Sequence, residues 1–180
     1  IILGLESARQ AVASLKKGRR IEELEQFALN DSMTGFYNRN AYDYFIYNEK
    51  NIKNYMMVTF DLNNLKMCND NYGHSSGDAY IIHSAHIIET TFDRFGKCYR
   101  IGGDEFCCLI PDAAEFQIER FIQKMQQDIA ILNNKNIIPT EVGIACGYAL
   151  ATPDDADIEK VRERADEMMY HNKKVLKGLI

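Results

Sequence analysis

The stretch Arg100-Ile-Gly-Gly-Asp-Glu-Phe-Cys-Cys-Leu-Ile110 decides the fold, because a glycine pair and an acidic pair separate a short lead-in from an apolar run. The pattern predicts a strand, a tight turn and a second, buried strand. Gly102 and Gly103 are expected to give the turn access to positive φ and to let a ligand approach the backbone closely. Asp104 and Glu105 then lie at the rim of a sheet. They are either an ordinary solvent-facing pair or part of a site whose other members lie elsewhere.

Composition describes a soluble globular chain of 180 residues, 46% apolar and 26% charged, for which one domain is the default. A net charge of −5 argues against a nucleic-acid partner. Five cysteines without C-x-x-C spacing predict reduced thiols, and hence a cytoplasmic location, rather than a disulfide framework or a zinc site. The sequence contains no apolar run long enough to span a bilayer, so we expect no membrane contact by this fragment. Because the chain starts at Ile1, we expect a piece of a longer protein with an upstream sensory module, and a membrane anchor upstream stays open.

Hydrophobic periodicity predicts helices and strands in alternation, interrupted by the hairpin. Helices are expected at about 4–30, 38–47, 78–95, 113–133 and 157–176, and strands at 55–60 and 142–150 as well as in the hairpin. The expected fold is a single α/β or α+β domain in which helices cover a sheet, with an N-terminal helical extension. That extension is either a coiled-coil linker that passes a signal or a helix packed on the domain. The polar, glycine-punctuated stretch 61–78 is expected to be loop and short helix that carries function.

Asp61 follows the apolar strand 55–60, which is suited to the centre of a sheet. If that strand neighbours the hairpin, Asp61 and Asp104 converge and offer two hard oxygen ligands for Mg²⁺. Such a cation, completed by phosphate oxygens, is expected for nucleoside triphosphate chemistry. The alternative is that Asp61 only caps the next turn.

Lysines and amide or carboxylate side chains supply the remaining groups for a nucleotide. Lys66, Lys173, Lys174 and Lys177 could neutralise phosphates, while Asn69 and Asp78 could bind a base, with the carboxylate favouring guanine over adenine. The sequence has no G-x-x-x-x-G-K-[ST], no G-x-G-x-x-G after a strand and no G-x-S-x-G. These absences exclude a P-loop enzyme and a Rossmann site, and leave no basis for a Ser-His-Asp hydrolase.

Four separated motifs resemble the GGDEF family of diguanylate cyclases over roughly residues 30–178. Residues 31–39 resemble D-x-L-T-G-L-x-N-R, residues 61–78 resemble D-x-D-x-F-K-x-x-N-D-x-x-G-H-x-x-G-D, residues 100–106 match R-x-G-G-D-E-F, and residues 165–173 resemble A-D-x-A-L-Y-x-A-K. The resemblance implies a mostly antiparallel sheet of the nucleotidyl-cyclase or palm type. It also implies the condensation of two GTP into cyclic di-GMP with release of pyrophosphate, and a domain at 30–180 after a signalling helix at 1–29.

The resemblance also implies roles for individual residues. Mg²⁺, or Mn²⁺ in its place, would be held by Asp61, the Leu62 carbonyl and Asp104, with Asp104 or Glu105 assisting deprotonation of the 3′-hydroxyl and Lys66 steadying the transition state. Substrate binding is implied for Asn69, His74, Asp78, Gly102, Gly103, Lys173 and Lys177. Two domains would meet face to face as a homodimer, aided by the N-terminal helix. The alternative is a weak or inactive domain that serves as a GTP-binding or regulatory interaction module.

Several positions depart from the family pattern. Asn63 replaces the second Asp of D-x-D, and Leu65 replaces Phe. Leu176-Lys177 replaces a Gly-Arg pair. Because a lysine binds phosphate through one group where an arginine binds through two, this last replacement predicts weaker triphosphate binding without its loss. The product-inhibition motif R-x-x-D would begin nine residues before Gly102, where the chain has Asp93-Arg94-Phe95-Gly96. We therefore expect no high-affinity feedback site of that kind.

Overall fold

A four-stranded antiparallel sheet forms the centre of the molecule. The computed structural model describes residues 28–49, 51–113, 117–176 and 178. The strands are β1 (Met56–Asn63), β2 (Lys97–Arg100), β3 (Glu105–Ile110) and β4 (Gly143–Leu150), in the order β2-β3-β1-β4. Every neighbouring pair is antiparallel, which confirms the expected sheet. All residues of β1 are buried, as expected for a central strand.

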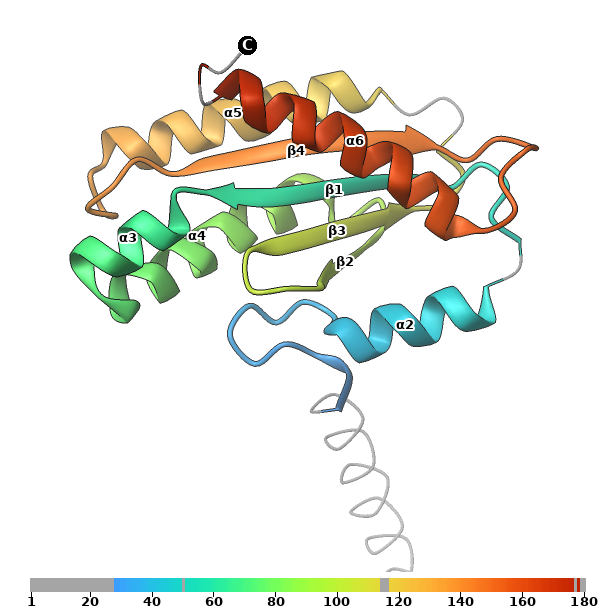
Figure 1. Ribbon diagram of the computed structural model, residues 1–180, viewed down its shortest axis with the longest axis horizontal. Helices are drawn as coiled ribbons and strands as arrows, with labels where there is room; N and C mark the ends of the chain where they lie inside the picture. Colours follow the sequence, from blue (N-terminus) through green and yellow to red (C-terminus); the bar gives the residue numbers. More distant parts are fainter. Residues whose placement is uncertain (1–27, 50, 114–116, 177, 179–180) are drawn as a thin grey trace, which may run out of the picture.

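Helices cover both faces of this sheet, and Figure 1 shows α6 crossing one face while α4 and α5 lie behind the other. The helices are α2 (Arg39–Asn48), α3 (Leu65–Tyr72), α4 (His74–Phe92), α5 (Ile118–Asn134) and α6 (Ile158–Leu176). Because side chains alternate along a strand, Val58 and Phe60 join the larger core with α4 and α5, while Met57 joins the smaller core with α2 and α6. The result is a three-layer arrangement.

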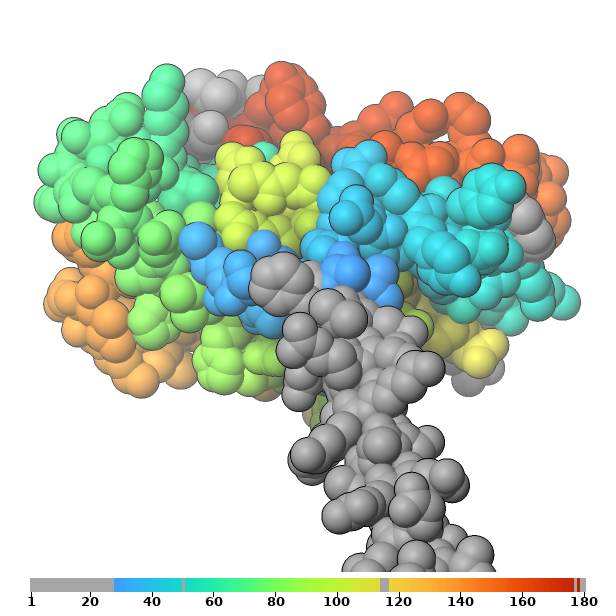
Figure 2. Space-filling model, turned by 90° about the horizontal axis from the view of Figure 1, so that it is seen from below, coloured from blue at the N-terminus to red at the C-terminus, as the bar shows by residue number. Residues whose placement is uncertain are grey.

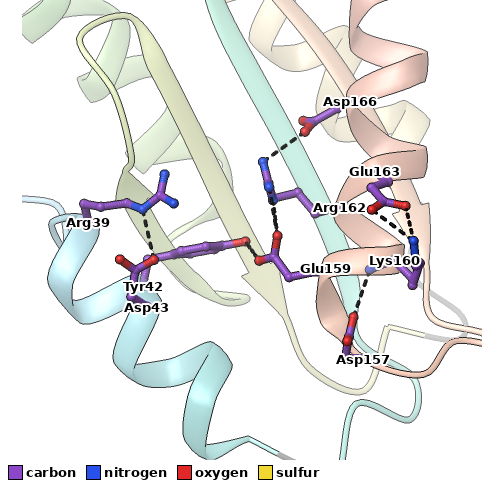
Figure 3. A network of polar contacts seen from close by, with 9 residues as sticks. All are labelled: Arg39, Tyr42, Asp43, Asp157, Glu159, Lys160, Arg162, Glu163 and Asp166. Carbon is purple, nitrogen blue, oxygen red and sulfur yellow. Dashed lines mark hydrogen bonds and ion pairs between the residues drawn. The ribbon is translucent and has the colours of Figure 1, made fainter.

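Polar side chains tie α2 to α6 at the edge of the smaller core, as Figure 3 shows. The hydroxyl of Tyr42 donates to Glu159 Oε1 at 3.0 Å. Arg162 donates to Glu159 at 2.9 Å and to Asp166 at 3.2 Å. Burial raises the pKa of Asp166 above its ordinary value, although Arg162 opposes the shift. The network fixes α2 beside the helix that carries Lys173.

Gly147 sets the distance between α6 and β4. A Cβ at this position would collide with the backbone of Ala165 and Met169, so only glycine lets the helix lie this close. Val161 and Ala165 of the same helix are fully buried. The close approach brings the C-terminal half of α6 over the end of β1.

Three local expectations were wrong. β1 does not end at Asp61, because residues 61–63 continue to pair with β4 as far as Gly143. Residues 65–78 are almost wholly helical, in α3 and the start of α4. Neither Gly102 nor Gly103 has a positive φ.

The expected N-terminal helix at about 4–30 lies mostly outside the described residues. Of its described residues, 28 and 29 are helical, whereas Asn30 forms a bridge with Tyr37. Within the described part of the chain, no helix combines the length and the apolar content that crossing a membrane requires.

Candidate functional site

The site forms at the edge of the sheet where β3 begins and β1 continues beyond it. Asp61 stands opposite Glu105 in the β1–β3 ladder, and the Leu62 N–H donates to the Asp104 carbonyl at 3.0 Å. A residue in an antiparallel ladder points its N–H and C=O toward the same neighbouring strand, so the Leu62 carbonyl also faces the turn that carries Asp104. The expected proximity of Asp61 and Asp104 is confirmed by this register.

Lys173 of α6 reaches this point from the other face of the sheet. Its Nζ lies 2.6 Å from Asp61 Oδ1, an ion pair in which the Asp61 side chain is 11% exposed and the Lys173 side chain 25%. Residues 112 positions apart in the chain therefore meet at the end of β1. The pair neutralises a carboxylate that is nearly shut off from solvent.

A cavity of about 450 Å³ opens beside the pair. Its lining includes Leu62 and Asp104 from the sheet, Lys66 from α3 and Lys173 from α6. Asp70 and other residues of α3 complete the wall. Four of the residues predicted from the sequence thus share one concave surface with both cationic and anionic groups.

The two residues predicted to bind the base lie on the neighbouring α3–α4 corner. Asn69 is half-buried in α3, and its side chain fills the space where a Cβ on Gly77 would sit. Asp78 follows Gly77 in α4 and is exposed, as is His74 at the start of that helix. The chain turns between the helices at Gly73, whose φ of 82° favours glycine. Asn69 and Asp78 are therefore brought to one corner, but neither lines the cavity.

The hairpin turn is fixed by Arg100, a residue to which the sequence analysis gave no role. One guanidinium nitrogen donates to the Gly103 carbonyl at 2.8 Å and another to Asp31 Oδ1 at 3.1 Å. Figure 2 shows residues near 30–37, in blue, packed against this hairpin, in yellow-green. Burial alone would raise the pKa of Asp31, but hydrogen bonds from Thr34 and the Arg100 guanidinium together lower it. The sequence signal for the contact between Asp31 and Arg100 was that these residues begin the motifs at 31–39 and 100–106.

Tyr80 is a second supporting residue that the sequence analysis missed. Its side chain is fully buried in α4, and its hydroxyl donates to the Asn63 carbonyl at 2.5 Å and accepts from the Gly143 N–H at 2.7 Å. Burial raises the pKa of this phenol to about 12. Tyr80 thereby holds Asn63, the last residue of β1, against Gly143 of β4. Asn63 directly follows Leu62, whose carbonyl belongs to the site.

The remaining predicted residues are placed as follows. Gly102 lies against the Glu105 side chain, whereas Gly103 has open space where a side chain would stand. Glu105 is exposed at the start of β3. Lys177 lies outside the described residues.

The site offers oxygen groups suited to a hard divalent cation. The carboxylates of Asp61 and Asp104 and the Leu62 carbonyl, carried by adjacent backbone segments, are oxygen groups of the kind that Mg²⁺ takes, with waters and phosphate oxygens completing its shell. No group of three or more His, Cys, Asp or Glu side chains suited to a metal occurs among the described residues. The residues fit a cation that a phosphate ligand helps to hold.

An antiparallel sheet flanked by helices, with acids and lysines around one cavity, defines an α/β domain suited to a phosphorylated ligand. Comparison with known families assigns residues 28–177 to "Diguanylate cyclase, GGDEF domain", and the chain belongs to the GGDEF family.

Individual relatives agree with this assignment. Diguanylate cyclase DgcN of Escherichia coli is 31% identical over 157 residues, which cover 84% of this chain and 38% of DgcN. Diguanylate cyclase DgcS of Shewanella oneidensis is 26% identical over 168 residues, covering 88% of this chain and 54% of DgcS. The chain thus spans about half or less of the length of these relatives. The coiled coil and GGDEF domain of DgcB from Caulobacter crescentus, in complex with c-di-GMP, superimposes with a TM-score of 0.77 at 23% identity, covering 93% of this chain and 94% of that one.

Proposed function

We propose that this chain is a diguanylate cyclase domain that condenses two GTP molecules into cyclic di-GMP and releases pyrophosphate. The observation that carries the proposal is a cavity lined by Leu62, Asp104, Lys66 and Lys173, with Asp61 beside it in an ion pair with Lys173. Family membership and relatives named diguanylate cyclase support it.

Asp61, the Leu62 carbonyl and Asp104 would hold Mg²⁺, or Mn²⁺ in its place. A cation bound there would neutralise charge on the triphosphate and favour in-line attack at the α-phosphate. Lys66 would stabilise the negative charge that develops in the transition state. Lys173, which pairs with Asp61 in this structure, would contact the triphosphate. Asp104 or Glu105 would accept the proton of the attacking 3′-hydroxyl.

The α3–α4 corner would bind the base. The Asp78 carboxylate can accept hydrogen bonds from the N1–H and the exocyclic amine of guanine, and adenine offers no such pair of donors. Asn69 supplies an amide beside it, and His74 lies at the same end of α4. The proposal therefore includes GTP as the preferred substrate over ATP.

Each domain would hold one GTP, so that catalysis requires two copies face to face. We further propose that residues 1–29 are a signalling helix that helps to form this homodimer, that 30–180 are a cyclase domain located in the cytoplasm, and that an upstream sensory module of a longer protein controls it. The dimer requirement predicts a rate of product formation that rises more than linearly with protein concentration.

Product chromatography tests the substrate and the reaction together. Purified protein at several concentrations is incubated with Mg²⁺ and GTP, ATP or both, and the nucleotides are separated. We expect cyclic di-GMP in the incubations that contain GTP and no cyclic product in the incubation with ATP only. The Asp78→Ala variant should lose this preference for GTP. GTP binding by calorimetry without any product at the highest concentration would instead support a GTP-binding module.

A further inference from the structure

Two cysteines face each other across the first two strands of the sheet. Cys98 of β2 and Cys108 of β3 are register partners, and their thiols form a hydrogen bond with 3.5 Å between the Sγ atoms. Both side chains are buried on the face that packs against α4 and α5. The next cysteine, Cys107, points to the opposite face and belongs to the smaller core.

The backbone pattern shows which kind of ladder position they occupy. The Cys98 carbonyl accepts from the Tyr37 N–H at 3.1 Å, on the side away from β3, while Ile101 N–H donates to Glu105 at 3.0 Å. Cys98 and Cys108 are therefore a non-hydrogen-bonded pair, the closer of the two antiparallel arrangements, with Cα atoms typically about 4.5 Å apart. Disulfides span Cα separations of about 4.4 to 6.8 Å.

We propose that Cys98 and Cys108 form an oxidisable dithiol, a modification site that a peroxide closes to an intramolecular disulfide and a thiol reductant reopens. The Cys98 thiolate attacks the peroxide and gives a sulfenic acid and hydroxide. The Cys108 thiol then displaces the hydroxyl from this sulfenic acid, forming the S–S bond and water. In total two thiols and one hydrogen peroxide give one disulfide and two waters.

The order of the two sulfurs follows from their surroundings. The hydrogen bond with Cys98 and burial raise the pKa of the Cys108 thiol, which disfavours its reaction as a thiolate. Cys98 lies on the outermost strand β2, whose outer side is paired, among the described residues, with Tyr37 alone, so a local opening of that pairing would admit a peroxide. Cys68 and Cys146 lie on α3 and β4, outside this pair of strands.

The disulfide would staple the β2–β3 hairpin at a point two residues before Arg100. It closes a loop that contains the Gly102–Asp104 turn. Closing such a loop stabilises the fold by restricting the unfolded chain, so the melting temperature should rise by about 5 to 10 °C. This consequence does not depend on the proposed cyclase activity.

Peptide mapping of the full chain tests the proposal directly. Folded protein is treated with hydrogen peroxide, denatured, alkylated and cut with trypsin. The expected result is a link between the peptide Cys98-Tyr99-Arg100 and the peptide 101–120, with Cys107 alkylated, Cys108 in the bond, and the link lost after dithiothreitol. Five alkylated cysteines, a link through Cys107, an over-oxidised Cys98 beside a free Cys108, or a bond between two chains would each overturn the proposal.

Matched variants guard against an effect of packing. Cys107→Ala removes the neighbouring thiol on the same strand and should keep both the link and the rise in melting temperature on oxidation. Cys98→Ala should abolish both. A peroxide-induced rise in Cys98→Ala equal to that of the unmodified chain would refute the assignment, whatever the stability of the reduced variants.

Discussion

Replacing Lys173 by Met should destabilise the domain through the carboxylate that it leaves behind. Asp61 is buried at the end of β1, its side chain 11% exposed, with Lys173 Nζ 2.6 Å away. Removing one member of a buried pair costs about 3 to 5 kcal/mol, and the 25% exposure of the Lys173 side chain reduces this to about 2 to 3 kcal/mol. Helix propensity contributes little, because Met and Lys are similar in that respect.

Urea unfolding followed by circular dichroism measures this loss. The midpoint should fall without a change in the slope of the free energy against urea. The matched control is Lys174→Met on the same helix, whose ammonium lies over the Tyr170 ring and contributes about 0.5 kcal/mol. The double variant Asp61→Asn, Lys173→Met has no buried charge, so it should regain most of the stability that Lys173→Met alone loses. Equal midpoints for the Lys173 and Lys174 variants would refute the reasoning.

Three further perturbations test the supports of the site. Arg100→Lys keeps the charge but cannot bind Asp31 and the Gly103 carbonyl together, so about 1.5 to 3 kcal/mol of unfolding free energy should be lost in urea titrations. Tyr80→Phe leaves the Asn63 carbonyl and its β4 partner without the hydroxyl and should cost a similar amount. In the unmodified chain the raised phenol pKa means that the contribution of Tyr80 is complete below about pH 10 and is lost as the pH rises toward 12, which alkaline melting curves should show.

Each of these expectations has an outcome that contradicts it. Arg39→Lys, at an exposed ion pair, is the control for Arg100, and equal losses from the two would argue against the clamp on the turn. For Tyr80, a phenylalanine variant whose melting temperature falls between pH 10 and 12 as steeply as that of the unmodified chain would show that another group titrates there.

The missing R-x-x-D motif gives a prediction about the product. Arg94 stands one position too late in the chain and lies over the Phe95 ring at 4.5 Å. Calorimetry with cyclic di-GMP should detect no high-affinity site on the isolated chain. Tight binding that Arg94→Ala abolishes would contradict this expectation.

The hairpin, the central strand and the helical layers could be predicted because their signals are local. Cys107 to Ile110 and Tyr55 to Phe60 are short apolar runs, and the helices repeat apolar residues at three and four positions. The proximity of Asp61 and Asp104 also followed once the two strands were assumed to be neighbours. These are properties that a few consecutive residues determine.

The features that could not be predicted from the sequence depend on tertiary contacts. Residues 65–78 are polar, but Leu65 and Cys68 bury one side of α3, which is enough to keep the segment helical. The continuation of β1 to Asn63 depends on pairing with β4, whose partner residues Gly143 to Ala145 are far away in the chain. Arg100 meets Asp31 across 69 positions, and no spacing rule predicts such a pair.

The most direct test of the proposed site is the release of pyrophosphate from GTP with Mg²⁺, measured for the unmodified chain and for Asp104→Ala at a concentration that sustains dimers. The proposal predicts steady release by the unmodified chain, with one pyrophosphate per GTP consumed, and a loss of at least about 100-fold in the variant. A variant that folds normally and releases pyrophosphate at the rate of the unmodified chain would contradict the proposal that Asp104 belongs to the catalytic site.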